Sequence, residues 1–158
     1  MKKFFAFSLF LMLLIIFTIF QNHFLCEFNF SENYNYFTYV NDKNLSLKGY
    51  DVIKNGNGLI IKTTDKNSYK LLSLVSDKMY GECLEFNDVN TSILLQEIIN
   101  KLQLKIINYE QIDNITVING YCGKFNKYVK KNNIKFNIQI VIKNNTLLLG
   151  HPAVIHSY

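Results

Sequence analysis

An unbroken apolar run near the N-terminus constrains this chain more than any other feature. Residues 4–20 contain no charged side chain and follow directly after Lys2 and Lys3. A helix over this run would be about 25 Å long, which is close to the hydrocarbon thickness of a bilayer. Because two lysines precede the run and none directly follows it, the N-terminus is expected inside and the remainder is expected to be exported. The sequence therefore predicts an N-terminal transmembrane helix and contact with a membrane through residues 4–20.

The residues after the run bear on whether it is a cleaved signal peptide or a permanent anchor. Signal peptidase requires small residues at the last and third-last positions before the cut, and no window of residues 21–26 fits this pattern well. The run is also longer than a usual signal-peptide core, which favours an anchor. Cys26 raises the alternative of a lipoprotein, but residues 23–25 are bulky where a lipoprotein signal requires small ones. We interpret residues 1–26 as a signal anchor or signal peptide, so that the rest is held outside the cytoplasm at the cell membrane, or secreted if the leader is cleaved.

The remaining chain, residues 27–158, has the length of one domain. The formal net charge is +5, and without Lys2 and Lys3 the remaining 15 lysines exceed the 12 acidic residues by only three. The chain contains no arginine, the side chain best suited to bidentate contacts with phosphates and bases. The sequence therefore predicts no nucleic-acid partner.

Three cysteines, Cys26, Cys83 and Cys122, are an odd number for an exported protein, so at least one is free or paired outside the chain. A disulfide between Cys83 and Cys122 requires that their strands are neighbours, and the sequence leaves this open. The chain has no CxxC motif and no group of cysteine and histidine at metal-binding spacing. We predict no metal site and no cofactor.

The exported part begins with polar and aromatic residues, and 27–46 are interpreted as a membrane-proximal segment or a short helix. A pattern typical of strands follows, and the folded domain is expected to span 47–158. The residues at 55–58 separate two apolar runs and predict a hairpin, because Asn and Gly both accept positive φ. A strand pair is expected at 69–75 and 78–86.

A helix is predicted over 89–104, where apolar residues recur at intervals of three and four. Asn87 and Asp88 precede it as candidate N-caps. Strands are expected next at 106–109 and 115–121, because both segments are rich in β-branched and aromatic residues.

The clearest alternation in the chain lies at 134–143 and predicts a strand with two distinct faces. One face carries the apolar side chains Ile134, Phe136, Ile138, Ile140 and Ile142, and the other carries Lys135, Asn137, Gln139, Val141 and Lys143. A turn at 144–145 leads to a strand at 146–149, and a last strand is expected at 154–157. These patterns together predict an α+β fold in which one antiparallel sheet packs against one or two helices.

The segment 78–158 resembles the YwmB family of exported proteins from spore-forming Gram-positive bacteria. The sequence YGECLEF at 80–86 is similar to the family's entry into its helix, and ITVINGY at 115–121 is similar to its next strand. The C-terminal end is the most specific part, because it repeats an Asn-led amphipathic strand, a Gly-x-Pro element and a terminal tyrosine at Asn137, Gly150, Pro152 and Tyr158. The resemblance implies a TATA-box-binding-protein-like fold and a link to sporulation.

Two surfaces are candidate binding sites. Asn137 and Gln139 project opposite the apolar face of their strand, so we expect them on the exposed face of the sheet, where Asn137→Ala would leave folding nearly unchanged. A basic cluster lies before that strand and at its start, and consists of Lys124, Lys127, Lys130, Lys131 and Lys135. Its charge suits an anionic lipid, a wall polymer or an acidic partner, although a solvated loop is the simpler interpretation.

Residues suited to catalysis are sparse. A Cys/His site would require the fold to bring His151 or His156 to a cysteine. A carboxylate pair for glycoside cleavage has candidates in Glu82, Glu85 and Asp88, but acidic residues at a helix entrance are more simply explained by capping.

We therefore predict a membrane-anchored extracytoplasmic protein of the bacterial cell envelope that acts by binding and is not an enzyme. Its expected partner is an envelope protein or a wall polymer, and the sporulation link comes from the resemblance alone. The alternative is an envelope enzyme with an unrecognised Cys/His or carboxylate site. A pocket that joins His151 or His156 to a cysteine or an acid favours the enzyme, whereas a polar sheet face favours the binding protein.

Overall fold

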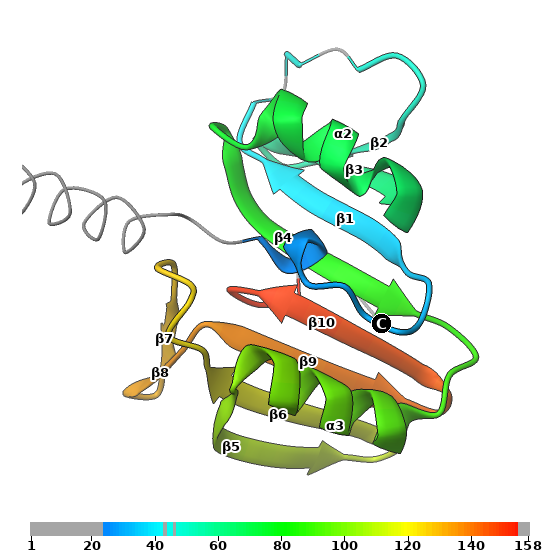
Figure 1. Cartoon of the computed structure of the whole chain (residues 1–158). Helices are drawn as coiled ribbons and strands as arrows, with labels where there is room; N and C mark the ends of the chain where they lie inside the picture. Colours follow the sequence, from blue (N-terminus) through cyan, green and yellow to red (C-terminus); the bar gives the residue numbers. More distant parts are fainter. Residues whose placement is uncertain (1–23, 43, 46, 155–158) are drawn as a thin grey trace, which may run out of the picture.

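The computed structural model describes residues 24–42, 44–45 and 47–154 (Figure 1). These residues form ten strands, two α helices and one 3-10 turn. The elements are η1 (Leu25–Glu27), β1 (Asn35–Val40), β2 (Asp51–Asn55), β3 (Gly58–Thr64), α2 (Asp65–Val75), β4 (Met79–Phe86), α3 (Thr91–Leu102), β5 (Lys105–Ile112), β6 (Ile115–Tyr121), β7 (Val129–Lys131), β8 (Ile134–Phe136), β9 (Ile138–Lys143) and β10 (Thr146–His151). Eight strands make one antiparallel sheet in the order β2-β3-β1-β4-β10-β9-β6-β5, and β7 and β8 pair separately.

Both α helices lie on the same face of the large sheet (Figure 1). α2 covers the half that contains β1 and β3, and α3 covers the half that contains β6 and β9. Leu71 of α2 and Ile98 of α3 belong to one buried cluster with strand residues such as Ile61 and Ile140. A single core therefore runs beneath both helices, as expected when each helix buries one apolar stripe against a sheet.

The two predicted turns are confirmed. β2 and β3 form a hairpin in which Asn55 pairs with Gly58, and Gly56 has a φ of +58°, which only glycine adopts readily. β9 and β10 form the second hairpin across residues 144–145, where Asn144 has a φ of +53°. Asparagine is the non-glycine residue that best tolerates this conformation. The turn chemistry was therefore readable from the sequence.

The predicted helix at 89–104 is present, but it begins and ends inside the expected range. α3 begins after Asn90, whose side-chain oxygen accepts a hydrogen bond from the Ile93 amide at 3.2 Å. Asn90 is therefore the N-cap in place of Asn87 or Asp88. The helix ends where Gln103 takes a left-handed conformation with a φ of +50°.

The prediction of a strand at 69–75 was wrong, because these residues belong to α2. The buried residues of α2 are Ser68, Leu71, Leu72 and Val75, at intervals of three, one and three. This spacing places them on one face of a helix, whereas alternate positions would be buried in a strand. The segment after 78 does form the expected strand, β4.

The expected fold class has to be corrected. We expected a transmembrane helix followed by one sheet in a TATA-box-binding-protein-like arrangement, whereas the described residues form a sheet-dominated α+β fold of ten strands and two α helices. None of the helices in the described part of the chain is long and apolar enough to span a bilayer. α2 and α3 have 11 and 12 residues, short of the roughly 20 apolar residues that a span requires. The predicted transmembrane segment itself, residues 4–20, lies outside the described residues.

The expected domain boundary at residue 47 also has to be moved. The segment at 27–46 was interpreted as a membrane-proximal segment or short helix, but it contains β1, an internal strand hydrogen-bonded to β3 and β4. Leu25 and Cys26 are buried in the core as well. The folded unit therefore includes every described residue from the start of η1 onward. The expected last strand at 154–157 is not formed at Val154, and residues 155–158 lie outside the described residues.

The placement of Asn137 on an exposed face was wrong. The alternating segment is two strands, β8 and β9, which belong to different sheets and are separated by Asn137. The Asn137 side chain is fully buried, accepts a hydrogen bond from the Cys122 amide and donates to the carbonyls of Cys122 and Phe125. The donor–acceptor distance is 2.7 Å for the bond from the Cys122 amide, 2.7 Å for the bond to the Cys122 carbonyl and 2.9 Å for the bond to the Phe125 carbonyl. The polar residue in the pattern therefore satisfies buried backbone groups between the strands, which periodicity alone does not reveal.

Asn137→Ala is expected to destabilise the domain by about 3 kcal/mol, because it leaves one amide and two carbonyls without side-chain partners in the core. Urea unfolding followed by circular dichroism measures the effect. The exposed Asn67 of α2 provides a matched control, since Asn67→Ala is expected to be neutral or slightly stabilising in a helix. Equal stability of the two variants would contradict the structural role of Asn137.

Candidate functional site

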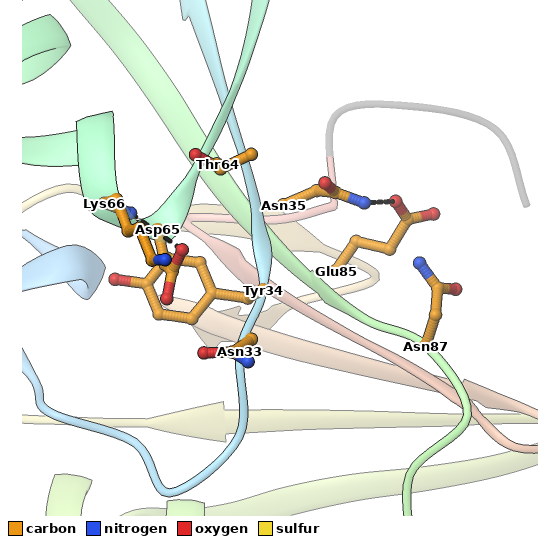
Figure 2. Close-up of a pocket in the computed structure, with 8 residues that line it drawn as sticks. All are labelled: Asn33, Tyr34, Asn35, Thr64, Asp65, Lys66, Glu85 and Asn87. Atoms are coloured by element: carbon orange, nitrogen blue, oxygen red, sulfur yellow. Dashed lines mark hydrogen bonds between the residues drawn. The ribbon is translucent and has the colours of Figure 1, made fainter.

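A polar cavity of about 380 Å³ lies where the start of β1, the start of α2 and the end of β4 meet (Figure 2). Its lining combines three asparagines with two carboxylates, one lysine, one threonine and one tyrosine. These residues are Asn33, Tyr34, Asn35, Thr64, Asp65, Lys66, Glu85 and Asn87. The lining therefore converges from three segments that are far apart in the sequence.

Tyr34 is held in place from two sides. Its carbonyl accepts a hydrogen bond from the Asp65 amide at 3.0 Å, which fixes the chain entering β1 against the start of α2. Its ring packs against the ring of Phe86, with centroids 5.6 Å apart and planes at 64°. Burial raises the pKa of the Tyr34 phenol, so the hydroxyl stays protonated at neutral pH and is able to donate a hydrogen bond.

The strand register places an amide beside a carboxylate at the same site. Asn35 lies directly opposite Glu85 in the β1–β4 ladder, and its side-chain nitrogen donates to Glu85 Oε2 at 3.0 Å (Figure 2). Thr64 lies opposite Asn35 on the other side, in β3. Asp65 Oδ1 accepts a hydrogen bond from the Lys66 amide at 2.7 Å. These contacts hold the planar polar groups in fixed positions before any ligand binds.

A second cavity of about 360 Å³ shares Asn33, Tyr34, Asp65 and Lys66 with the first. Its further lining residues are Cys26, Phe28, Asn29, Phe30, Glu32 and Tyr69. We call the two adjoining cavities the Tyr34 groove. Tyr69 contributes a ring that is 58% exposed, and the groove carries three carboxylates against one lysine. The groove is therefore polar, weakly acidic and partly aromatic.

The described residues contain no group of three or more His, Cys, Asp or Glu side chains arranged to hold a metal ion. Asp65 and Glu85 both line the first cavity, but each already accepts a hydrogen bond from a neighbouring amide. The arrangement suits hydrogen bonding to a polar ligand, with Tyr34 and Tyr69 available for stacking.

No protein-family model matches this chain, and a search of curated proteins finds no match either.

Glu82 forms a separate polar cluster inside the core. Its side chain is fully buried in β4, where Oε1 accepts a hydrogen bond from the Leu25 amide at 2.7 Å and Oε2 accepts one from the Tyr36 hydroxyl at 3.0 Å. His151 Nδ1 lies 3.5 Å from Glu82 Oε1, and the imidazole stacks on the ring of Phe125 with centroids 4.3 Å apart. Neither ring nitrogen of His151 has a hydrogen-bond partner among the described residues.

The contact between His151 and Glu82 joins a histidine to an acid, which is part of the pattern that would favour an enzyme. Both side chains are more than nine-tenths buried, however, and neither lines the Tyr34 groove. Burial raises the pKa of Cys26 to about 12 and also raises that of Cys122, so both remain neutral thiols near neutral pH. Neutral buried thiols are poor nucleophiles. His156, the other histidine considered for a Cys/His site, lies outside the described residues.

The remaining sequence-predicted residues are dispersed. Gln139 donates to Asn119 and accepts from the Val154 amide, on a sheet face that carries a second apolar cluster. That cluster contains Phe37, Ile60, Cys83, Val117, Val141 and Leu148. The face opposite the helices is therefore largely apolar around Gln139, and the polar binding face expected there is not formed.

The five lysines of the basic cluster divide into two groups. Lys124 donates to the Lys101 carbonyl and lies over the Phe28 ring, and Lys127 donates to the Met79 carbonyl. Lys130, Lys131 and Lys135 lie on the exposed β7–β8 hairpin. Cys83 and Cys122 are not joined to each other, so the disulfide that the sequence left open is not formed.

Sequence reasoning missed the Tyr34 groove. Asn35 and Asp65 have no distinctive local motif. The strand register brings Asn35 to Glu85, and the hydrogen bond from the Asp65 amide to the Tyr34 carbonyl brings the start of α2 beside β1. The available signal was the alternation within the aromatic stretch that forms β1, which was interpreted as a membrane-proximal segment.

The burial of the Cys26 thiol predicts a loss of stability at alkaline pH. The unfolded thiol ionises near its ordinary pKa of 9.0, whereas the folded thiol stays protonated until about 12. Above pH 9 the unfolded state therefore binds fewer protons than the folded state. The contribution of the protonated Cys26 thiol to the free energy of unfolding is complete below about pH 9 and is lost as the pH rises towards 12. Urea midpoints across this range measure the fall. The urea midpoint of Cys26→Ala should fall less steeply with pH than that of wild type. Tyr80→Phe, a change at an exposed site, should fall as steeply as wild type. The same dependence on pH in wild type and both variants would contradict the role of Cys26.

Proposed function

We propose that this chain is an extracytoplasmic binding protein of the cell envelope and that its ligand lies in the Tyr34 groove. The apolar leader behind Lys2 and Lys3 supports export. The observation that carries the binding site is that one cavity is lined from both sides of β1, by Tyr34 and Asp65 on one side and by the Asn35–Glu85 pair on the other (Figure 2). Fixed amide and carboxylate groups in a cavity that an aromatic ring also lines are suited to orienting a polar ligand.

The chemistry of the groove favours a glycan of the cell wall over the other predicted envelope partners. Sugar hydroxyl and acetamido groups donate and accept hydrogen bonds in pairs, and asparagine and carboxylate side chains complement both. The apolar faces of sugar rings also stack on tyrosine rings such as those of Tyr34 and Tyr69. An anionic wall polymer suits the groove less, because Glu32, Asp65 and Glu85 outnumber Lys66 there.

Binding without turnover is the activity that we propose. Cys26 lines the second cavity of the groove, but its raised pKa keeps it a neutral thiol, which is a poor nucleophile. The His151–Glu82 pair is enclosed, and a catalytic group must reach its substrate. Both observations support this choice. The resemblance to the YwmB family adds the proposal that the protein acts in a spore-forming bacterium, at sporulation.

The proposal predicts that Glu85→Gln weakens glycan binding by about tenfold, since a hydrogen bond from a sugar hydroxyl to a charged acceptor is stronger than one to a neutral amide. A soluble oligomer of N-acetylglucosamine, titrated by calorimetry into the full-length protein in detergent, is the probe. The Asn108–Glu110 contact of β5 provides the matched control, because it is also an asparagine-to-glutamate hydrogen bond, at 2.7 Å, but lies outside the groove. Glu110→Gln should bind like wild type.

Equal affinity of both variants, or no binding of the oligomer by wild type, would contradict the groove as a glycan site. Release of shorter oligomers during the titration would contradict binding without turnover and would support the enzyme alternative.

A further inference from the structure

The β7–β8 hairpin combines positive charge, exposed aromatic surface and a well-defined turn. Lys130 and Lys135 lie directly opposite each other across the two strands. Like charges in this position repel, so the pairing is unfavourable for the hairpin by itself. Asn132 and Asn133 at the turn have φ values of +49° and +64°, as a tight two-residue hairpin turn requires. The hairpin therefore presents its lysines on a defined scaffold.

An aromatic ring accompanies these lysines. Tyr128 precedes β7 and is 52% exposed, and Lys135 Nζ lies 3.7 Å from the centre of its ring. Exposed tyrosine beside lysine is typical of segments at a membrane–water interface, where the ring reaches the headgroup level and the ammonium groups contact phosphates.

The charge is also segregated along the sequence. After Asp113 the chain contains no acidic residue, although it contains six lysines. These are Lys124, Lys127, Lys130, Lys131, Lys135 and Lys143. The acidic side chains of the Tyr34 groove come from earlier segments of the chain. Glu110 of β5 lines a small cavity together with Lys131, so a carboxylate also lies beside the hairpin. The three lysines of the hairpin outnumber it, and an anionic partner is therefore favoured at the hairpin over the groove.

The base of the hairpin lies beside the start of the described chain. The Phe28 and Phe125 rings are 5.9 Å apart, and Lys124 Nζ lies 5.0 Å from the Phe28 ring. β7 and β8 project at the end of the molecule where the described chain begins (Figure 1). The apolar run ends at Phe20 and the described chain begins at Phe24, so the distance between these two residues is at most about 14 Å even when the chain is fully extended. A leader held in a membrane therefore keeps this end of the domain close to the lipid surface.

We propose that the β7–β8 hairpin docks on the surface of an anionic phospholipid membrane. The inference goes beyond the glycan site and rests on the proposed retention of the leader in the membrane. Docking orients the domain, with the hairpin towards lipid phosphates. The Asn35–Glu85 pair of the Tyr34 groove lies at the opposite ends of the strands from Val40 and Met79, and Met79 is the residue whose carbonyl Lys127 contacts. The cavity lined by Asn35 and Glu85 therefore lies away from the hairpin, whereas the second cavity of the groove reaches Phe28 beside the base of the hairpin.

A tryptophan reporter tests the docking, because the chain has no tryptophan of its own. Tyr128→Trp places the reporter in the hairpin and preserves a ring for Lys135. The full-length protein is reconstituted in vesicles of phosphatidylcholine alone and of phosphatidylcholine with phosphatidylglycerol. In the anionic vesicles we expect a blue-shifted emission and protection from acrylamide, both lost at high salt because the attraction is screened. Tyr109→Trp at an exposed position of β5 is the matched control and should report no difference between the vesicles.

Replacing Lys130, Lys131 and Lys135 with glutamine in the Tyr128→Trp protein separates the lysines from the reporter. Each lysine is expected to contribute roughly fivefold to docking, so the triple variant should give the neutral-vesicle signal in anionic vesicles. Circular dichroism confirms that the variant is folded. Unchanged protection in the triple variant, or equal protection of the hairpin reporter in both kinds of vesicle, would overturn the proposal.

Two further arms identify the source of the effect. A soluble glycerol-phosphate polymer without vesicles should leave the reporter unchanged, and an equal shift with this polymer would assign the hairpin to wall phosphate and overturn lipid docking. Flotation with neutral vesicles tests retention by the leader separately. Failure to float with neutral vesicles, together with salt-sensitive flotation with anionic ones, would contradict the leader's role while supporting the hairpin's.

Discussion

The buried carboxylate of Glu82 is the contact that ties the first described residues to the sheet. It accepts hydrogen bonds from the Leu25 amide and the Tyr36 hydroxyl, and so connects η1, β1 and β4 at one point inside the core. A buried carboxylate is costly unless its oxygens are satisfied, and here both oxygens have donors. The contact with His151 brings β10, the strand that joins the two halves of the sheet, to the same point. Because Glu82 holds Leu25, the fold starts within a few residues of the apolar leader.

This early start has consequences for how the two proposed surfaces work together. A short connection leaves the domain little freedom to tumble relative to a membrane that holds the leader, so the basic hairpin and the acidic groove acquire fixed directions. In the proposed arrangement, lipid phosphates attract the lysines of the hairpin, whereas Asp65 and Glu85 favour neutral hydrogen-bonding ligands over anions. Under these two proposals, the same chain would bind two chemically different partners at separate surfaces.

Features with local chemistry were predictable from the sequence, whereas features that depend on strand register were not. The turns at 55–58 and 144–145 and the helix α3 were found because glycine, asparagine and the spacing of apolar residues act within one segment. α2 was mistaken for a strand because its four buried positions, Ser68 among them, form only one short stripe. Asn137 was expected on the exposed face of the sheet because alternation shows which residues share a face. Alternation does not show that backbone groups of Cys122 and Phe125 lie against that face and need a polar partner. The Tyr34 groove escaped detection because its lining comes from three separate segments.

The start of the fold at Leu25 is the central claim, and native-state hydrogen exchange of the full-length protein tests it most directly. The Leu25 amide donates to a fully buried carboxylate, so its exchange should be as slow as that of the amides within β4 and should require the same opening. Exchange of Leu25 at the rate of an unstructured peptide, while β4 stays protected, would show that Glu82 does not hold the N-terminal segment. The short connection between leader and domain, and the orientation that follows from it, would then be contradicted.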